Sequence, residues 1–502
     1  MSRLIPLLLL LLAVMTHAKD FSQYCGSTSM EKDCSAEFLQ ALNDASSNAF
    51  TLRFSPAHSY LIKNINTQGM GLAGVTLEGG NLVTNKLWLS DISQLTITDM
   101  HITGLATEQV QQPGALVLVG GKGAKAYNIY MKNITIEKAA EDLLVVVNAG
   151  TVTVKGSTLL YPGLAQRLHD ANTSDPRPRG SNLLLSGVSN VTIEDNIIKH
   201  ARKVGIYISS GDSKTSFVTI VGNRLNLLNE NLPSKRYGEL GGNGIYLDQT
   251  MDIDNVVVES NEIKNYRTSG IRINGSNITV TRNHFNRSIE ITDCKIKDDD
   301  PGVRKSGTAV KGHYLDQVTI SDNCVHNTLT GFHISAWGLV SNMQIFNNVI
   351  VDGSFGIYLD NNANGLLSNI GIFSNLIYGF NRYAIAFVNT KLATENYVIG
   401  NTISNGNPAR KLHSYGFAPK KFQGPAVVIK NQRAFTYQNN WLYGVATSVN
   451  WSHVILENIT QSSFFRNALV SPIQNDVGGF QIIKSVAKEQ IFYNHYSNVP
   501  AM

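Results

Sequence analysis

Short phrases that begin with glycine place large polar side chains at alternate positions of the chain. They read Gly205-Ile-Tyr-Ile, Gly244-Ile-Tyr-Leu-Asp248, Gly270-Ile-Arg-Ile, Gly331-Phe-His-Ile and Gly356-Ile-Tyr-Leu-Asp360. Successive side chains of a strand point to opposite faces, so the first and third residues after glycine should point inward and the second and fourth outward. The phrases therefore predict an outward row of tyrosine, arginine and histidine side chains, which can serve as acids, cations and bases.

If these phrases stack in parallel, their outward residues form two columns. Neighbours within a column would lie about 4.8 Å apart, the spacing of paired strands. With the intervening phrase counted from Gly307, the columns are Tyr207, Tyr246, Arg272, Ala309, His333, Tyr358, and beside them Ser209, Asp248, Asn274, Lys311, Ser335, Asp360. Ala309 would then leave room for a sugar ring between Arg272 and His333.

These side chains could abstract the proton beside the carboxylate of a uronic acid. That reaction needs a cation for the developing enolate, a base and an acid. Arg272 or Lys311 could neutralise the carboxylate. His333 could be the base, with Tyr358 or Tyr246 as the acid. The neighbouring outward residues would contact the substrate: Tyr207, Asp248, Asn274 and Asp360. The alternative for each residue is a surface ladder of packed polar groups.

The element that must position these residues is a repeat in which two apolar residues precede an asparagine. The apolar residues stand five and three positions before the asparagine, and another usually stands two after it, as around Asn196, Asn223, Asn261, Asn283, Asn323, Asn348 and Asn375. Strict alternation over a few residues indicates a strand, and its regular return indicates stacked coils that share one core. Asparagine tolerates the left-handed backbone of a bend, and stacked asparagines can hydrogen-bond along the column.

This pattern resembles the right-handed parallel β-helix of pectate-lyase-like proteins, although no single family's catalytic motif matches. The resemblance implies an all-β solenoid of about a dozen coils. An amphipathic segment over 35–45 should form an N-terminal capping helix. We expect a signal peptide over 1–18, the N-terminal cap and first strands over 19–62, the β-helix over 63–470 and a C-terminal cap over 471–502.

Four coils carry insertions, which should collect on one side of the solenoid and form a wall. The insertions contain basic and aromatic residues, among them Arg179, Arg236 and Tyr237, which we expect to contact substrate. A cleft with one sign of charge concentrates an anionic ligand. An acidic polysaccharide is therefore the predicted partner in preference to nucleic acid, while simple solvation of charged loops remains the alternative.

Export is predicted from the first residues of the chain. Arg3 precedes an apolar run that ends near Met15, and small residues follow up to Ala18, as in secretory signal peptides. No other stretch is long and apolar enough to span a bilayer, so the mature protein should be secreted or periplasmic. Disulfides persist in such compartments, and the two expected pairs join Cys25 to Cys34 and Cys294 to Cys324.

Lyases and C5-epimerases of uronans, among proteins of this fold, are built from similar residue types, and such an enzyme is the first prediction. A glycoside hydrolase needs two carboxyl groups about 5 to 10 Å apart. Asp248 and Asp360 would lie four levels apart, roughly 19 Å, so a hydrolase would need loop residues such as Asp170, Glu239 or Asp299. A non-catalytic glycan-binding or structural β-helix is the third alternative. No cofactor is required, although Asp298-Asp299-Asp300 could form a calcium loop. The oligomeric state is left open.

Overall fold

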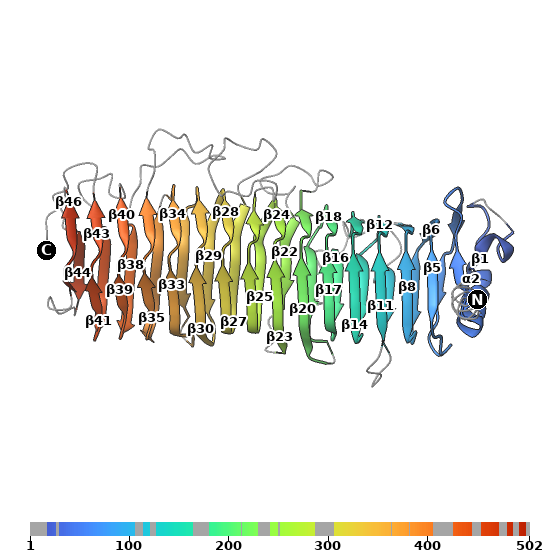
Figure 1. The fold of residues 1–502 in the computed structure, drawn as a ribbon, viewed down its shortest axis with the longest axis horizontal. Helices are drawn as coiled ribbons and strands as arrows, with labels where there is room; N and C mark the ends of the chain where they lie inside the picture. The colour runs from blue at the N-terminus through green and yellow to red at the C-terminus, as the bar shows by residue number, and fades with distance from the viewer. Residues whose placement is uncertain are drawn as a thin grey trace, which may run out of the picture. The chain divides into compact units, whose positions relative to one another are not determined.

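The computed structural model describes residues 18–26, 30–105, 114–120, 127–163, 180–211, 213–228, 241–248, 252–286, 306–362, 364–380, 382–404, 425–443, 453–470, 479–484 and 491–497. The chain divides into two compact units, residues 1–218 and 219–502. Both consist of short parallel strands stacked coil upon coil, with one α-helix near the N-terminus (Figure 1). The predicted all-β solenoid is therefore confirmed.

Each complete coil contributes three strands, which we call the first, second and third series. The Gly phrases form first-series strands, the apolar residues before the asparagine form second-series strands, and the residues after it form third-series strands. The first and second series belong to one sheet and the third series forms another. Both repeated patterns, the Gly phrase and the apolar residues before the asparagine, therefore form strands, and the residues after the asparagine form a third.

In unit 1 the strands are short. The first series contains β4 (Asn64–Asn66), β7 (Lys86–Ser90), β10 (Gly114–Val119), β13 (Asp142–Val147), β16 (Ser181–Ser186) and β19 (Val204–Ser209). The second contains β1 (Ala18–Asp20), β2 (Thr51–Arg53), β5 (Val75–Glu78), β8 (Gln94–Thr98), β11 (Asn128–Lys132), β14 (Thr151–Lys155) and β17 (Ser189–Glu194). The third contains β3 (Ser59–Leu61), β6 (Asn81–Thr84), β9 (His101–Gly104), β12 (Thr135–Glu137), β15 (Thr158–Leu160) and β18 (Ile197–Lys199). β20 (Thr215–Val221) contains the boundary between the units.

In unit 2 some strands run through two series. The first series contains β22 (Gly241–Leu247), β25 (Tyr266–Thr281), β27 (Ser306–Ser321), β29 (Thr328–Ala336), β32 (Phe355–Asn361), β35 (Tyr383–Thr394), β38 (Val427–Arg433), β41 (Val454–Thr460) and β44 (Phe480–Lys484). The second continues through β25 and β27 and adds β23 (Ile253–Glu259), β30 (Leu339–Phe346), β33 (Leu366–Phe373), β36 (Tyr397–Ile399), β39 (Thr436–Gln438), β42 (Ser463–Phe465) and β45 (Ile491–Phe492). The third contains β21 (Arg224–Asn226), β24 (Glu262–Lys264), β26 (His284–Phe285), β28 (Cys324–His326), β31 (Val349–Val351), β34 (Leu376–Tyr378), β37 (Thr402–Ser404), β40 (Trp441–Tyr443), β43 (Ala468–Val470) and β46 (His495–Ser497).

The N-terminal end of unit 1 carries a short 3₁₀ turn, η1 (Phe21–Gln23), and the helix α2 (Ser35–Asn48). The helix buries Phe38 and Leu42 and packs against β2, β4 and β5, where an end cap is expected. Cys25 and Cys34 form the predicted disulfide, with their Cα atoms 5.9 Å apart. Cys324 is also disulfide-bonded and is buried. Its predicted partner Cys294 lies outside the described residues, as does the predicted signal peptide up to residue 17.

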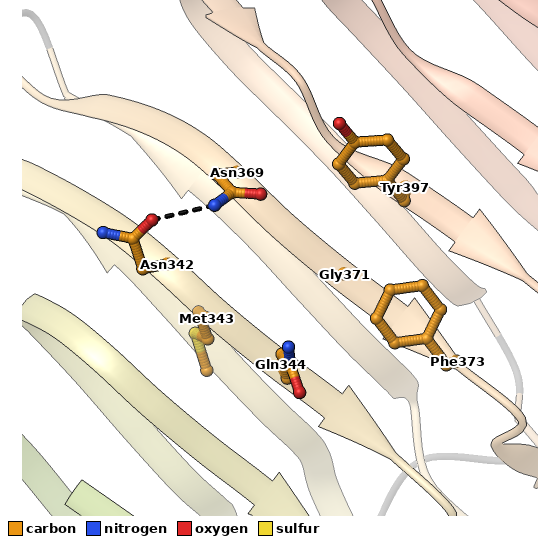
Figure 2. A pocket seen from close by; sticks show the side chains of 7 residues that line it. All are labelled: Asn342, Met343, Gln344, Asn369, Gly371, Phe373 and Tyr397. Carbon is orange, nitrogen blue, oxygen red and sulfur yellow. Dashed lines mark hydrogen bonds between the residues drawn. The ribbon is translucent and has the colours of Figure 1, made fainter. Parts of the chain in front are cut away.

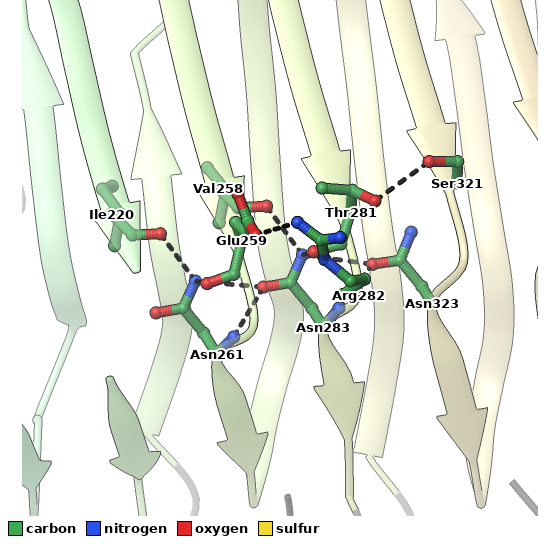
Figure 3. A network of polar contacts seen from close by, with 9 residues as sticks. All are labelled: Ile220, Val258, Glu259, Asn261, Thr281, Arg282, Asn283, Ser321 and Asn323. Carbon is green, nitrogen blue, oxygen red and sulfur yellow. Dashed lines mark hydrogen bonds and ion pairs between the residues drawn. The ribbon is translucent and has the colours of Figure 1, made fainter. Parts of the chain in front are cut away.

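Ladder asparagines in unit 2 form an uninterrupted chain of side-chain hydrogen bonds. The Nδ2 of Asn261 donates to the Oδ1 of Asn283 at 3.0 Å, and the Nδ2 of Asn283 donates to the Oδ1 of Asn323 at 3.1 Å (Figure 3). Each Oδ1 also accepts the backbone N–H of the preceding ladder residue, as between Asn283 and Asn323 at 2.9 Å. From Asn223 to Asn467 each ladder side chain is buried and hydrogen-bonded, so the ladder fixes this corner of the coils.

One detail of the predicted bend is wrong. The ladder asparagines do not adopt the left-handed backbone; the residue before each of them does, for example Ser260 (φ 52°), Arg282 (φ 54°) and Asp322 (φ 55°). That turn directs the asparagine side chain into the core, where it can reach both neighbouring coils. The column is therefore selected for its hydrogen bonds and not for a tolerance of positive φ.

The solenoid extends further than the sequence pattern suggested. Third-series strands mark six coils in the described part of unit 1 and ten in that of unit 2, against about a dozen predicted. The ladder continues from Asn440 to Asn467 and Asn494, beyond the last copy that we recognised. The described part of the predicted C-terminal cap, 471–502, contains one further coil formed by β44, β45 and β46.

Candidate functional site

Five consecutive first-series strands of unit 2 carry one outward column of large polar side chains. The strand register pairs Tyr246 with Arg272, Arg272 with Lys311, Lys311 with His333, and His333 with Tyr358. Paired strands lie about 4.8 Å apart, so these side chains are immediate neighbours. The inward residues between them, such as Ile271 and Val310, are fully buried, as the alternation predicted.

The predicted position of Ala309 in this column is wrong. Thr308 pairs with Ser269 and Val310 with Ile271, which places Ala309 in the column of phrase glycines, where it is fully buried. The prediction took Gly307 as the glycine of this phrase, whereas Ala309, two residues later, occupies that position in the structure. The predicted gap for a sugar ring is therefore filled by Lys311, which stands directly between Arg272 and His333.

His333 and Asp360 form the central contact of the site. The Nε2 of His333 lies 3.3 Å from the Oδ2 of Asp360, and the His333 ring meets the Tyr358 ring edge-on at a centroid distance of 5.2 Å. Burial alone would raise the pKa of Asp360, but the hydrogen bonds from His333 and Ser335 outweigh it and leave this pKa below its usual value. Asp360 is therefore a carboxylate at neutral pH and holds the imidazole from one side.

Two cations, Arg272 and Lys311, lie in the same column as this histidine. No ion pair neutralises Arg272 or Lys311 within the part of the chain that the structure describes, and the Nε of Arg272 is buried without a hydrogen bond there. The guanidinium carbon of Arg272 lies 4.7 Å from the ring centroid of Tyr246. Burial, and then the charge of Arg272, lower the pKa of Lys311. Two neighbouring positive charges favour an anionic group at this level.

Tyr246 and Tyr358 stand at the two ends of this column. Burial is the main cause that raises the pKa of both phenols. For Tyr246, the charge of Arg272 opposes this shift; for Tyr358, the charge of Asp360 adds to it. Both phenols therefore stay protonated at neutral pH and can donate a proton. Beyond Tyr358 the column becomes apolar, with Ala386 on the next strand.

The sequence reasoning missed His313 and Trp337. His313 is 2% exposed, its Nδ1 lies 3.1 Å from the Ser335 carbonyl oxygen, and burial lowers its pKa to about 4. The Trp337 indole packs on this neutral ring at a centroid distance of 4.4 Å and remains 42% exposed. The alternation that makes His333 and Ser335 point outward continues to position 337, and this pattern could have predicted an outward Trp337. An exposed indole is a suitable platform for a sugar ring.

Other predicted substrate contacts are not all brought together. Asp248 is partly exposed on the unit 2 face, whereas Asn274 is fully buried and donates through Nδ2 to the Leu247 carbonyl oxygen at 2.9 Å. Tyr207 belongs to unit 1 and is 4% exposed. Arg179, Arg236, Tyr237 and the Asp298–Asp300 loop lie outside the described residues. Among the residues that are described, no group of three or more His, Cys, Asp or Glu side chains could hold a metal ion.

The chain was compared with known families and structures. The model of the right-handed β-helix region matches residues 231–403 and 286–460. An exopolygalacturonase from Thermotoga maritima is 10% identical, with 84% of this chain and 91% of that chain covered at a TM-score of 0.46. PfbA, a surface adhesin of Streptococcus pneumoniae, is 13% identical, with 89% and 92% covered at a TM-score of 0.41.

A third similar structure is the catalytic unit of an α-1,3-glucanase from Streptomyces thermodiastaticus. It is 13% identical, with 82% of this chain and 65% of that chain covered at a TM-score of 0.47. A search of curated proteins found no match. None of the described helices is long and apolar enough to cross a membrane. Family model and coil geometry agree on the architecture: residues 231–460 match the right-handed β-helix region, and the described strands stack in parallel as the coils of a β-helix.

Proposed function

We propose that this protein is an exported enzyme that abstracts the C5 proton of a uronic acid residue in an acidic polysaccharide, as a lyase or a C5-epimerase. The observation that carries the proposal is the unbroken column of Arg272, Lys311, His333 and Tyr358 on four paired strands, with Asp360 bound to the histidine. A cation, a base and an acid are the groups that this chemistry requires.

In the proposed reaction the uronate carboxylate lies against Arg272 and Lys311. Their charges stabilise the enolate that forms when the C5–H bond breaks. His333 takes this proton through Nδ1, because its Nε2 faces Asp360. Asp360 stabilises the imidazolium that results.

The two possible outcomes differ in where the electron pair goes next. In a lyase it forms the C4–C5 double bond, the bond from C4 to the glycosidic oxygen breaks, and Tyr358 protonates the leaving oxygen. In an epimerase the electron pair takes a proton on the opposite face of C5, and no bond to oxygen breaks. A glycoside hydrolase is less favoured, because Asp248 and Asp360 lie four strand spacings apart, roughly 19 Å, which exceeds the separation of a carboxyl pair.

The test is incubation of the purified protein with alginate, polygalacturonate, hyaluronan and chondroitin, once in ordinary water and once in D₂O. Ultraviolet absorbance of the unsaturated uronate would identify a lyase, and deuterium at C5 without cleavage would identify an epimerase. His333→Ala should remove either signal while the thermal transition stays unchanged. Absence of both signals on all four glycans would reject the proposal; binding without turnover would then favour the non-catalytic alternative.

A further inference from the structure

A second, chemically different depression lies on the second-series face of unit 2. It has a volume of about 410 Å³ and is lined by Asn342, Met343, Gln344, Asn369, Gly371, Phe373 and Tyr397, from β30, β33 and β36 (Figure 2). None of these side chains carries a charge at neutral pH. The depression therefore differs in kind from the cationic column of the first-series strands.

The depression exists because one glycine interrupts an outward column. The register pairs Gln344 with Gly371 and Gly371 with Tyr397. Paired strands are about 4.8 Å apart, so the missing side chain leaves roughly 10 Å between the Gln344 and Tyr397 positions. The Phe373 ring covers the glycine so closely that a Cβ atom there would lie 2.0 Å from it. The result is a shallow floor with aromatic rings from Phe373 and Tyr397 beside it (Figure 2).

A chain of hydrogen bonds fixes how the amides face this depression. The Oδ1 of Asp316 accepts from the Nδ2 of Asn342 at 2.8 Å, and the Oδ1 of Asn342 accepts from the Nδ2 of Asn369 at 2.8 Å. A carboxylate can only accept, so both amide orientations follow from Asp316. The Oδ1 of Asn369 then points away from Asn342 and accepts no hydrogen bond from the described residues (Figure 2). The Gln344 amide makes no hydrogen bond within the described chain and can both donate and accept.

We propose that this depression binds an uncharged pyranose residue of a glycan. Aromatic rings pack against the C–H face of a sugar, and fixed amides bond its hydroxyl groups, which is the usual composition of a polar-ligand site on an apolar floor. A uronate is not the expected ligand, because none of the described residues that line the site is a cation. This site is independent of the proposed lyase or epimerase reaction, and it would anchor neutral portions of a glycan on another face of unit 2.

The test is isothermal titration of the full chain with cellohexaose, mannohexaose and maltohexaose, with trigalacturonate as the charged comparison. At least one neutral hexasaccharide should bind. Phe373→Ala, which removes the aromatic wall, and Gly371→Gln, which fills the depression, should each weaken that binding by at least about tenfold.

The matched control is Phe465→Ala, which removes an outward phenylalanine of the same column, three strands further along. Its binding should equal that of the unchanged protein. Failure of all three neutral hexasaccharides to bind, or equal binding by all three variants with unchanged thermal transitions, would overturn the proposal. Neutral glycans lack the carboxylate that the first site needs, so neither result depends on the uronate chemistry.

Discussion

The Nε2 of His333 lies 3.3 Å from the Oδ2 of Asp360 on the neighbouring strand, while the other carboxylate oxygen, Oδ1, is buried without a hydrogen-bond partner within the described chain. The carboxylate therefore orients the imidazole from one side and leaves Nδ1 for a substrate. This arrangement has the geometry of a base that is held in place by a second residue, on a rigid sheet where neither backbone can shift independently.

Replacement of His333 or Asp360 should lower kcat and leave KM nearly unchanged. His333→Gln should lower kcat by about 100-fold or more, the usual contribution of a general base, with little change in KM. Asp360→Asn should lower kcat less, because the imidazole remains but loses its orienting charge. Steady-state kinetics on the active uronan measure both effects, with Ser335→Ala as a neighbouring control. A rise in KM alone would assign these residues to substrate binding.

The effect of replacing Arg272 or Lys311 on activity should depend on the charge of the substrate. Lys311→Met keeps the length of the side chain and removes its charge, and should lower kcat/KM on a uronan by about 10- to 1000-fold, the range for loss of one electrostatic contact in a transition state. Arg272→Lys should recover part of the activity that Arg272→Met loses, because the charge remains. Methyl-esterified substrate, which lacks the negative charge, should be less sensitive to both changes; equal sensitivity would contradict carboxylate binding.

Trp337 provides a direct optical measurement of substrate binding. Its indole is 42% exposed and packs on neutral His313, so a sugar that stacks on it should change its fluorescence. Trp337→Phe should keep most of the affinity and lose the fluorescence change, whereas Trp337→Ala should lose affinity by about tenfold. Trp441→Phe, at an indole on β40 that is 54% exposed, is the control and should retain both. A fluorescence change that survives in Trp337→Phe would place the sugar elsewhere.

Loss of a buried ladder asparagine should lower the free energy of unfolding more than loss of an exposed amide. Asn323→Ala removes an acceptor for the backbone and side-chain N–H groups of Asn283 and a donor to the Val280 carbonyl. Buried groups left without partners should cost about 2 to 4 kcal/mol of the free energy of unfolding. Gln344→Ala, at an exposed amide of the same unit, should change it by less than about 0.5 kcal/mol. Urea unfolding compares them, and similar losses in both would contradict the role of the ladder.

Mild acid should destabilise the protein through buried histidine. Burial lowers the pKa of His453 from 6.5 to about 4. Between pH 6.5 and about pH 4, His453 is protonated in the unfolded chain but neutral in the folded chain. The free energy of unfolding therefore falls as the pH falls from 6.5 toward 4. His453→Gln should remove about 1 to 3 kcal/mol of this pH-dependent loss. The slope of unfolding free energy against pH is the measurement, with the partly exposed His101→Gln as the control; an unchanged slope in His453→Gln would refute the assignment.

The fold could be predicted from the sequence because it rests on local periodicity. Apolar residues at fixed distances from each asparagine, such as Val318 and Ile320 before Asn323, are the residues that the structure buries. The site was harder to predict, because one phrase lacks its glycine: Ala309 stands in that position, and a glycine two residues earlier gave the wrong register for Lys311. The contact between His313 and Trp337 was not predicted, because it depends on that register. Residues in the long insertions follow no repeat, so no periodicity could place Arg179 or Arg236.

Asn223 and Asn261 are separated by 38 residues and Asn261 and Asn283 by 22, yet both pairs join through hydrogen bonds of 2.9 and 3.0 Å. The length of a coil is therefore uncoupled from its register. A segment inserted between one ladder asparagine and the next first-series strand changes neither the stacking below it nor that above. Recognition loops on such a scaffold can be lengthened, exchanged or transplanted as independent modules, and selection or design can alter ligand preference there without refolding the molecule that carries it.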